Sequence, residues 1–114
     1  MRNMEYSNHN VIRAKESLDK SLERLADYLG GVKRLSHHLL SVGDTNQWLR
    51  VTYDLSFFVS NVGIECSYIP SMMRNLIELR KSSYDTTLKA EVDILMNETK
   101  VKFANLLRLN LINE

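Results

Sequence analysis

Three kinds of residue are scarce in this chain, and each scarcity excludes something. Its 114 residues include one cysteine, one proline and four glycines. A single cysteine cannot form an internal disulfide or a zinc site built from thiolates. Because proline and glycine interrupt helices, having few of them favours long helices over many short strands. We therefore expect helix ends near the few that are present.

Long apolar runs and an excess of charge are also missing. No stretch approaches about 18 consecutive apolar residues, which predicts that the chain does not span a membrane. The first ten residues are polar, unlike a secretory signal. With one cysteine, the sequence predicts a cytoplasmic protein. The formal net charge of +1 argues against a strongly electrostatic partner, such as bulk nucleic acid or an anionic membrane.

Residues 44–68 are the most apolar part of the chain. They contain its only Trp, two of its three Phe and its only Cys. One apolar line has spacings of three and four and consists of Trp48, Val51, Leu55, Phe58 and Val62. A second line, at spacings of four, consists of Leu49, Tyr53 and Phe57. Both are typical of a helix. A helix that is apolar on two sides needs cover on two sides, so we expect the central helix of a bundle here.

The remaining segments predict helices that surround the central one. The first begins near His9 or Asn10, with Asn10 as N-cap, and ends at Gly30-Gly31. Its apolar line consists of Val11, Ala14, Leu18, Leu22, Leu25 and Leu29. Asp44 is the expected cap of the central helix. Pro70 is expected to end that helix, because the residue before proline avoids the α conformation. The other predicted helices cover residues 32–41, 70–81 and 86–109, and Asp85 is the expected N-cap of the last. The predicted fold is all-α: a single domain over residues 1–114, forming an antiparallel four-helix bundle with one additional short connecting helix, after a loose segment at residues 1–8.

The pair His37-His38 is the first candidate for chemistry. The fragment Leu35-Ser-His-His-Leu-Leu resembles the phosphoacceptor region of histidine-phosphotransfer domains, which are single helical bundles of similar length. The resemblance implies a signalling module that uses His37 or His38 as phosphoacceptor. The sequence departs from that family where a Lys-Gly pair should follow the histidine, since Leu39-Leu40 stand there. Two histidines on an amphipathic helix without a chemical role remain the alternative reading.

No set of residues with the spacing of a catalytic or metal site is evident. Cys66 lies beside Glu65, which would raise the pKa of its thiol, and we interpret it as a structural residue of the core. The sequence has no His-x-x-x-His pair, no Glu-x-x-His motif and no glycine-rich phosphate loop. We therefore predict a protein that is not an enzyme and that holds no cofactor or metal.

Basic residues suggest a DNA-associated regulator as a further alternative. Lys33, Arg34 and Arg50 form one possible patch, and Arg74 with Arg80-Lys81 forms another. The balanced charge of the chain and the few base-reading side chains of residues 32–41 argue against it.

The best sequence hint of function is apolar surface near the C-terminus. The predicted last helix and the tail have more apolar surface than one small bundle would cover. Met side chains are also common at adaptable binding surfaces. The candidate interaction surface consists of Met72, Met73, Phe103, Leu107, Leu109, Leu111 and Ile112. The sequence thus predicts a small protein–protein interaction module (a regulator, adaptor, subunit or inhibitor). Its expected partner is a second copy in a homodimer or a larger host protein.

Overall fold

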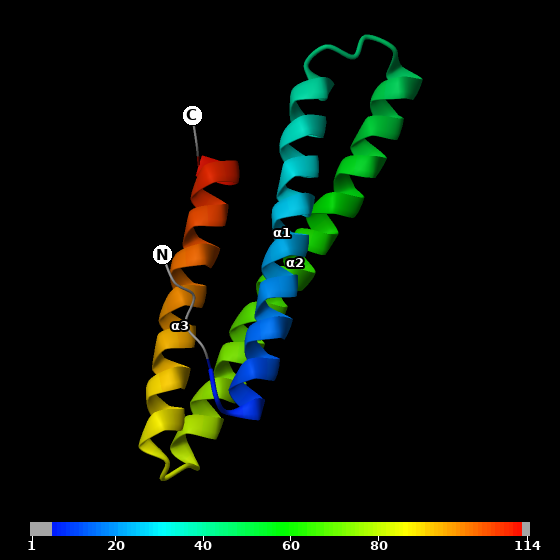
Figure 1. Cartoon of the computed structure of the whole chain (residues 1–114). Coiled ribbons are helices and arrows are strands. Elements are labelled where there is room, and N and C mark those ends of the chain that lie inside the picture. Colours follow the sequence, from blue (N-terminus) through cyan, green and yellow to red (C-terminus); the bar gives the residue numbers. More distant parts are fainter. Residues whose placement is uncertain (1–5, 113–114) are drawn as a thin grey trace.

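The structure is an up-down-up arrangement of three long helices (Figure 1). The computed structural model describes the backbone of residues 6–112 and the side chains of residues 6–110. Helix α1 spans His9–Leu39, α2 spans Thr45–Lys81 and α3 spans Thr86–Leu107, followed by a short π-helical segment, Arg108–Ile112. The described residues contain no strand. The all-α class is confirmed, but the prediction of a four-helix bundle with a short connecting helix is wrong.

The helices begin where side chains can cap them. Asp44 accepts a hydrogen bond from the backbone N–H of Gln47, and Asp85 accepts from those of Thr87 and Leu88. Such caps satisfy N–H groups that have no partner within the helix. The cap of α1 is Asn8 rather than the predicted Asn10.

Gly30-Gly31 does not end the first helix. Both glycines lie inside α1 and neither has a positive φ. A Cβ built on Gly31 would lie 2.7 Å from the ring of Phe58 on α2, so the missing side chain lets the two helices approach closely. A Cβ on Gly30 would meet nothing within 4 Å. The predicted separate helix over residues 32–41 is therefore the last part of α1.

Pro70 does not end the central helix either. It lies within α2, which continues to Lys81. A proline in a helix interior removes one hydrogen bond and costs about 3 kcal/mol. Ile69 and Leu76, on either side of it, are 1% and 2% exposed, and their burial favours a continuous helix across the proline.

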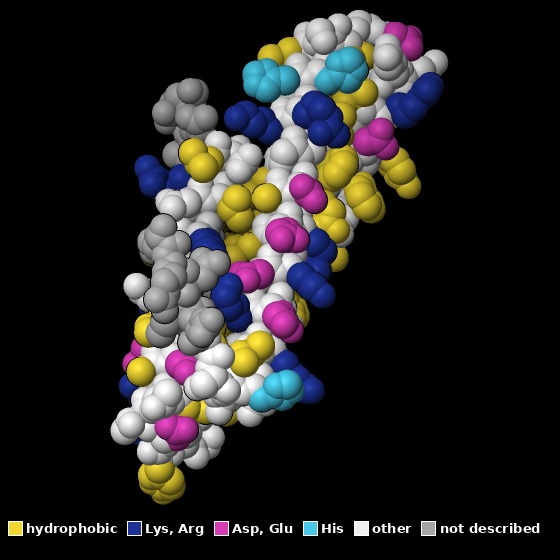
Figure 2. Space-filling view, viewed as in Figure 1, with side chains coloured by type: hydrophobic (Ala, Val, Ile, Leu, Met, Phe, Trp, Pro, Cys, Tyr) yellow, Lys and Arg dark blue, Asp and Glu magenta, His cyan; other side chains and the backbone are white. Residues whose placement is uncertain are grey.

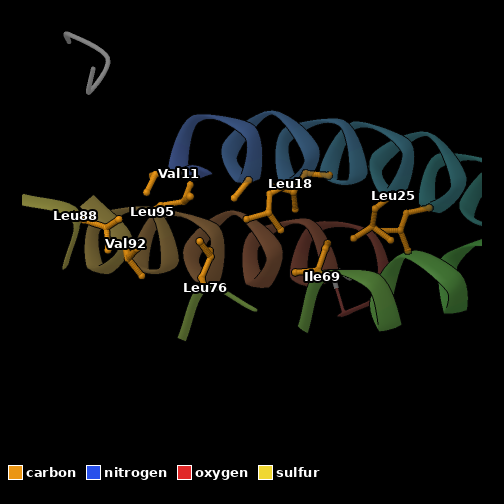
Figure 3. Packing of buried hydrophobic residues seen from close by; sticks show 11 residues of the cluster. Val11, Leu18, Leu25, Ile69, Leu76, Leu88, Val92 and Leu95 are labelled. Carbon is orange, nitrogen blue, oxygen red and sulfur yellow. The ribbon is translucent and has the colours of Figure 1, made fainter. Parts of the chain in front are cut away.

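The core lies where all three helices meet (Figure 3). The predicted apolar line of the first helix is confirmed, because Val11, Leu18, Leu25 and Leu29 are each 0% exposed. Residues from all three helices complete the cluster: Val11, Ala14, Leu18, Leu22, Leu25, Leu29, Ile69, Leu76, Leu88, Val92 and Leu95. We call this three-helix part, residues 6–29 and 65–107, the base.

Beyond the base, α1 and α2 continue as a two-helix hairpin from which α3 leans away (Figure 1). We call residues 30–64 the arm; all of them are described, and only Gly31 and Val51 are buried. The molecule measures 62 × 27 × 18 Å, and its radius of gyration is 18.0 Å. A compact domain of this length would have a radius of about 13 Å. The arm is therefore a projection rather than part of a closed bundle.

The segment before α1 is attached to α3. The backbone N–H and hydroxyl of Ser7 donate to Glu91, at 3.1 Å and 2.8 Å. The hydroxyl of Tyr6 donates to Glu98 at 3.1 Å. Burial and the neighbouring carboxylate of Glu98 raise the pKa of Tyr6 to about 12. Residues 6–8 of the segment that was predicted to be loose thus contact α3, and residues 1–5 lie outside the described part.

Candidate functional site: an apolar face on the arm

The outer side of α2 in and just below the arm exposes large apolar side chains. Tyr53 is 77% exposed, Ile64 61%, Phe57 59% and Leu49 54%. Their spacing, which Tyr68 continues at 36% exposure, places them on one side of the helix. Figure 2 shows hydrophobic side chains along this edge of the arm. We call the surface formed by Leu49, Tyr53, Phe57, Ile64 and Tyr68 the α2 face.

The expectation that α2 is covered on both apolar sides is therefore wrong. The other predicted line does turn toward α1: Val51 is buried and Phe58 is half-buried, although Trp48 remains 43% exposed. Only one helix, α1, packs on the arm part of α2 among the described residues, and one helix can cover only one side. The line Leu49, Tyr53 and Phe57 points away from it and stays in solvent.

The α2 face consists of a row of large side chains, the ridge, beside a row of small side chains, the small-residue row. Leu49, Tyr53 and Phe57 form the ridge, because they follow one another at intervals of four. The neighbouring row at the same interval holds Thr52, Ser56 and Ser60, whose side chains are small. Ile64 and Tyr68 continue this second row and make its far end bulky. The face therefore has relief as well as apolar area.

Several polar groups on this face already have partners inside α2. The hydroxyl of Thr52 donates to the carbonyl of Leu49 at 2.8 Å, and that of Ser56 donates to the carbonyl of Tyr53 at 2.8 Å. The side-chain amide of Asn61 donates to the carbonyl of Phe57 at 2.8 Å. Covering the face would therefore leave these donors bonded, which removes the usual penalty for burying polar groups.

Aromatic packing supports the inner edge of the face. Phe57 contacts Phe58 edge to face, with ring centroids 5.5 Å apart, and Phe58 lies 6.4 Å from the ring of Tyr28. The guanidinium carbon of Arg34 lies 6.0 Å from the centroid of Phe58. A groove of about 410 Å³ runs along this edge, lined by Arg34, Leu35, Tyr53, Asp54, Phe57 and Phe58. One edge of the Phe57 ring thus packs against Phe58, while its outer surface is exposed to solvent.

An ion pair between a buried carboxylate and a half-exposed arginine joins α1 and α2 where the arm meets the base. Glu65 is 5% exposed, accepts from the hydroxyl of Ser21 at 2.6 Å, and accepts from Arg24 Nε at 2.8 Å. The hydrogen bonds from Arg24 and Ser21 outweigh burial and lower the pKa of Glu65. This pair was not predicted, because Glu65 was interpreted only as a neighbour of Cys66. The sequence does contain a signal for it: Glu65 is a single acidic residue within an apolar stretch of helix, and an arginine lies on the helix that faces it.

The candidate surface predicted from the sequence occupies a different part of the molecule. Met72, Met73, Phe103 and Leu107 pack against the core. Leu109 is 62% exposed and lines a groove of about 490 Å³ between α1 and the end of the chain, together with Leu22, Ala26 and Leu106. The side chains of Leu111 and Ile112 lie outside the described part. Of the five predicted residues whose side chains are described, four therefore pack against the core and Leu109 is exposed.

The other candidate residues are separated from one another. His37 and His38 are exposed in the last turn of α1, near the tip of the arm. Cys66 is half-buried, and burial together with Glu65 raises the pKa of its thiol. Arg80 pairs with Asp93 at 2.8 Å, so one member of the second basic patch is already neutralised.

The described residues contain no group of three His, Cys, Asp or Glu side chains placed to hold a metal ion. Among the same residues, no helix has the length and apolar character needed to cross a membrane.

No family model, curated protein or solved structure matches this chain. Its function is therefore inferred from its own geometry.

Proposed function

We propose that this chain is a non-enzymatic protein–protein interaction module and that the α2 face is its binding surface. The observation that carries the proposal is the exposure of four large apolar side chains on one side of a helix: Leu49, Tyr53, Phe57 and Ile64. Contiguous apolar surface on a helix that its own chain leaves uncovered is typical of a site for another protein.

The amount of exposed surface supports the proposal. The accessible surface of the chain is 7889 Å². A compact monomer of 13.2 kDa would expose about 6,400 Å². A standard protein–protein interface buries about 800 Å² on each partner. The extra surface is therefore large enough to include a whole interface.

The charge pattern of the arm favours an apolar contact. Between Asp54 and Arg74, the only charged residue of α2 is Glu65, which is buried against Arg24. Interfaces commonly have a core depleted of charge and enriched in Tyr, Trp and Phe. The α2 face has both properties.

The proposal is tested by affinity capture from an extract of the cells that produce the protein. The arm variant carries Tyr53→Gln and Phe57→Gln. A matched control carries Lys20→Gln and Glu23→Gln, at two exposed positions of α1 in the base. We expect the wild type and the control to retain the same polypeptide, whether a further copy of the chain or another protein, and the arm variant to lose it. Equal capture by all three proteins would contradict the proposal.

A further inference from the structure

We propose that the partner of the α2 face is a second copy of this chain, and that the two α2 helices cross in parallel orientation, in register, near residues 56 and 57. This inference rests on the proposed function and names its partner. It follows from the relief, the chemistry and the area of the face.

The relief of the α2 face is complementary to itself. In a parallel, in-register pair that crosses between residues 56 and 57, Phe57 of one copy meets Ser60 of the other, and Tyr53 meets Ser56. The same arrangement brings Leu49 against Thr52. Each ridge then lies over the small-residue row of its partner, which is the contact made when rows at intervals of four interdigitate. Such helices cross at about 50° instead of running side by side.

The orientation follows from symmetry. In an antiparallel pair the two-fold axis runs across the rows and leaves their positions unchanged, so each ridge would lie over the ridge of the partner. In a parallel pair the two-fold axis runs along the rows and exchanges their two sides, so each ridge lies over the small-residue row. Both copies then use the same residues, and the contact closes as a dimer.

The chemistry of the face fits a copy of itself better than a charged partner. The residues that meet are uncharged, so bringing two copies together causes no repulsion within the contact, and the net charge of +1 adds little between whole molecules. The hydroxyls of Thr52 and Ser56 keep their bonds within the helix when covered. Arg50 and Asp54 are exposed beside the ridge and carry one charge of each sign, which favours neither a highly acidic nor a highly basic partner.

The area is sufficient for a dimer. Taking about 200 Å² for a fully exposed large side chain, Leu49, Tyr53, Phe57 and Ile64 together present roughly 500 Å². The small-residue row and the edge that bears Trp48 and Val59, 43% and 51% exposed, bring the total near the 800 Å² that a standard interface buries on each partner.

A large side chain in the small-residue row distinguishes a specific dimer from nonspecific apolar association. Ser56→Phe adds apolar surface to the face but occupies the place that Tyr53 of the partner needs. Sedimentation equilibrium should show that the dissociation constant of this variant rises about tenfold or more, because overfilling a packed contact is costly on this scale. The matched control, Ser36→Phe, adds the same group at an exposed position of α1 and should dimerise like the wild type. Tighter association of Ser56→Phe than of the wild type would overturn the proposal.

Spin-label distances test the orientation. In a Cys66→Ala background, labels are attached at Thr45→Cys, which is exposed and lies 11 to 12 residues from the crossing point, outside the small-residue row. In the parallel pair the two labels should lie roughly 15–25 Å apart, at 1.5 Å per residue and a crossing angle of about 50°. A distance of roughly 30–35 Å would indicate an antiparallel pair and would overturn the parallel assignment.

The two proposals fail in different ways. If the wild type is a monomer at every concentration, yet capture of another protein depends on Tyr53 and Phe57, the second copy is wrong and the interaction module stands. If association persists in the Tyr53→Gln, Phe57→Gln variant, the α2 face is not the binding surface and both proposals fail.

Discussion

The base and the arm are built from the same two helices, yet only the base has a closed core. In the base, α3 covers the side that α1 and α2 leave open, and Leu18, Leu25 and Ile69 are at most 1% exposed. In the arm that cover is missing, and Tyr53 and Phe57 stay in solvent. The helices α1 and α2 carry apolar side chains in both parts. These side chains differ in burial because α3 covers only the base. The base maintains the fold, and the arm presents a surface.

The largest predicted difference between the two parts concerns matched leucines. Leu18→Ala in the base should lower the free energy of unfolding by about 2–5 kcal/mol, because it leaves a cavity where three helices meet. Leu49→Ala in the arm, where the side chain is 54% exposed, should cost less than about 1 kcal/mol for the monomer. Urea unfolding of dilute protein measures both values. Equal losses would show that the arm is as well packed as the base.

The next prediction concerns the ion pair between arm and base. Glu65→Gln removes the charge that Arg24 and Ser21 stabilise, so we expect a loss of about 1–3 kcal/mol at pH 7. The exposed Glu16→Gln serves as the control and should change stability by less than about 0.5 kcal/mol. A loss in Glu65→Gln no larger than in the control would show that the pair contributes nothing.

The same pair predicts a dependence on pH. Folding lowers the pKa of Glu65 from its ordinary value of 4.5, so the folded state binds this proton less tightly than the unfolded state. Its contribution is fully present above pH 4.5 and is lost as the pH falls through the folded pKa. The stability gap between wild type and Glu65→Gln should therefore close on acidification. Unfolding curves from pH 7 to pH 3 check this, and a gap that stays constant would contradict it.

The smallest predicted effects have opposite signs at neighbouring positions. Gly30→Ala should raise the free energy of unfolding by about 1 kcal/mol, because alanine favours a helix and the site is open. Gly31→Ala should lower it by about 1–2 kcal/mol, since the ring of Phe58 must move to admit a Cβ. Thermal unfolding of the two variants decides the matter. Stabilisation by both would mean that α1 and α2 do not approach closely at Gly31.

Sequence periodicity predicted the helical class, the apolar line of α1 and the caps at Asp44 and Asp85. It failed where tertiary packing overrides local preference. Gly30-Gly31 and Pro70 are typical helix ends, but the contact at Phe58 and the burial of Ile69 keep the helices continuous.

The candidate site was predicted less well than the fold. Leu49, Tyr53 and Phe57 were identified as an apolar line and were assigned to the core. Periodicity shows that a face is apolar but does not show whether another helix of the same chain covers it. That depends on where α3 lies, which is a property of the whole fold.

Amide hydrogen exchange at two protein concentrations tests most directly whether the arm is the half that binds. At low concentration, residues 45–60 of α2 should exchange much faster than residues 11–29 of α1, because they lack a closed core. At high concentration, we expect residues 45–60 to become protected by a second copy while residues 11–29 remain unchanged. Exchange in residues 45–60 that is as slow as in the base and independent of concentration would contradict both the open arm and its self-association.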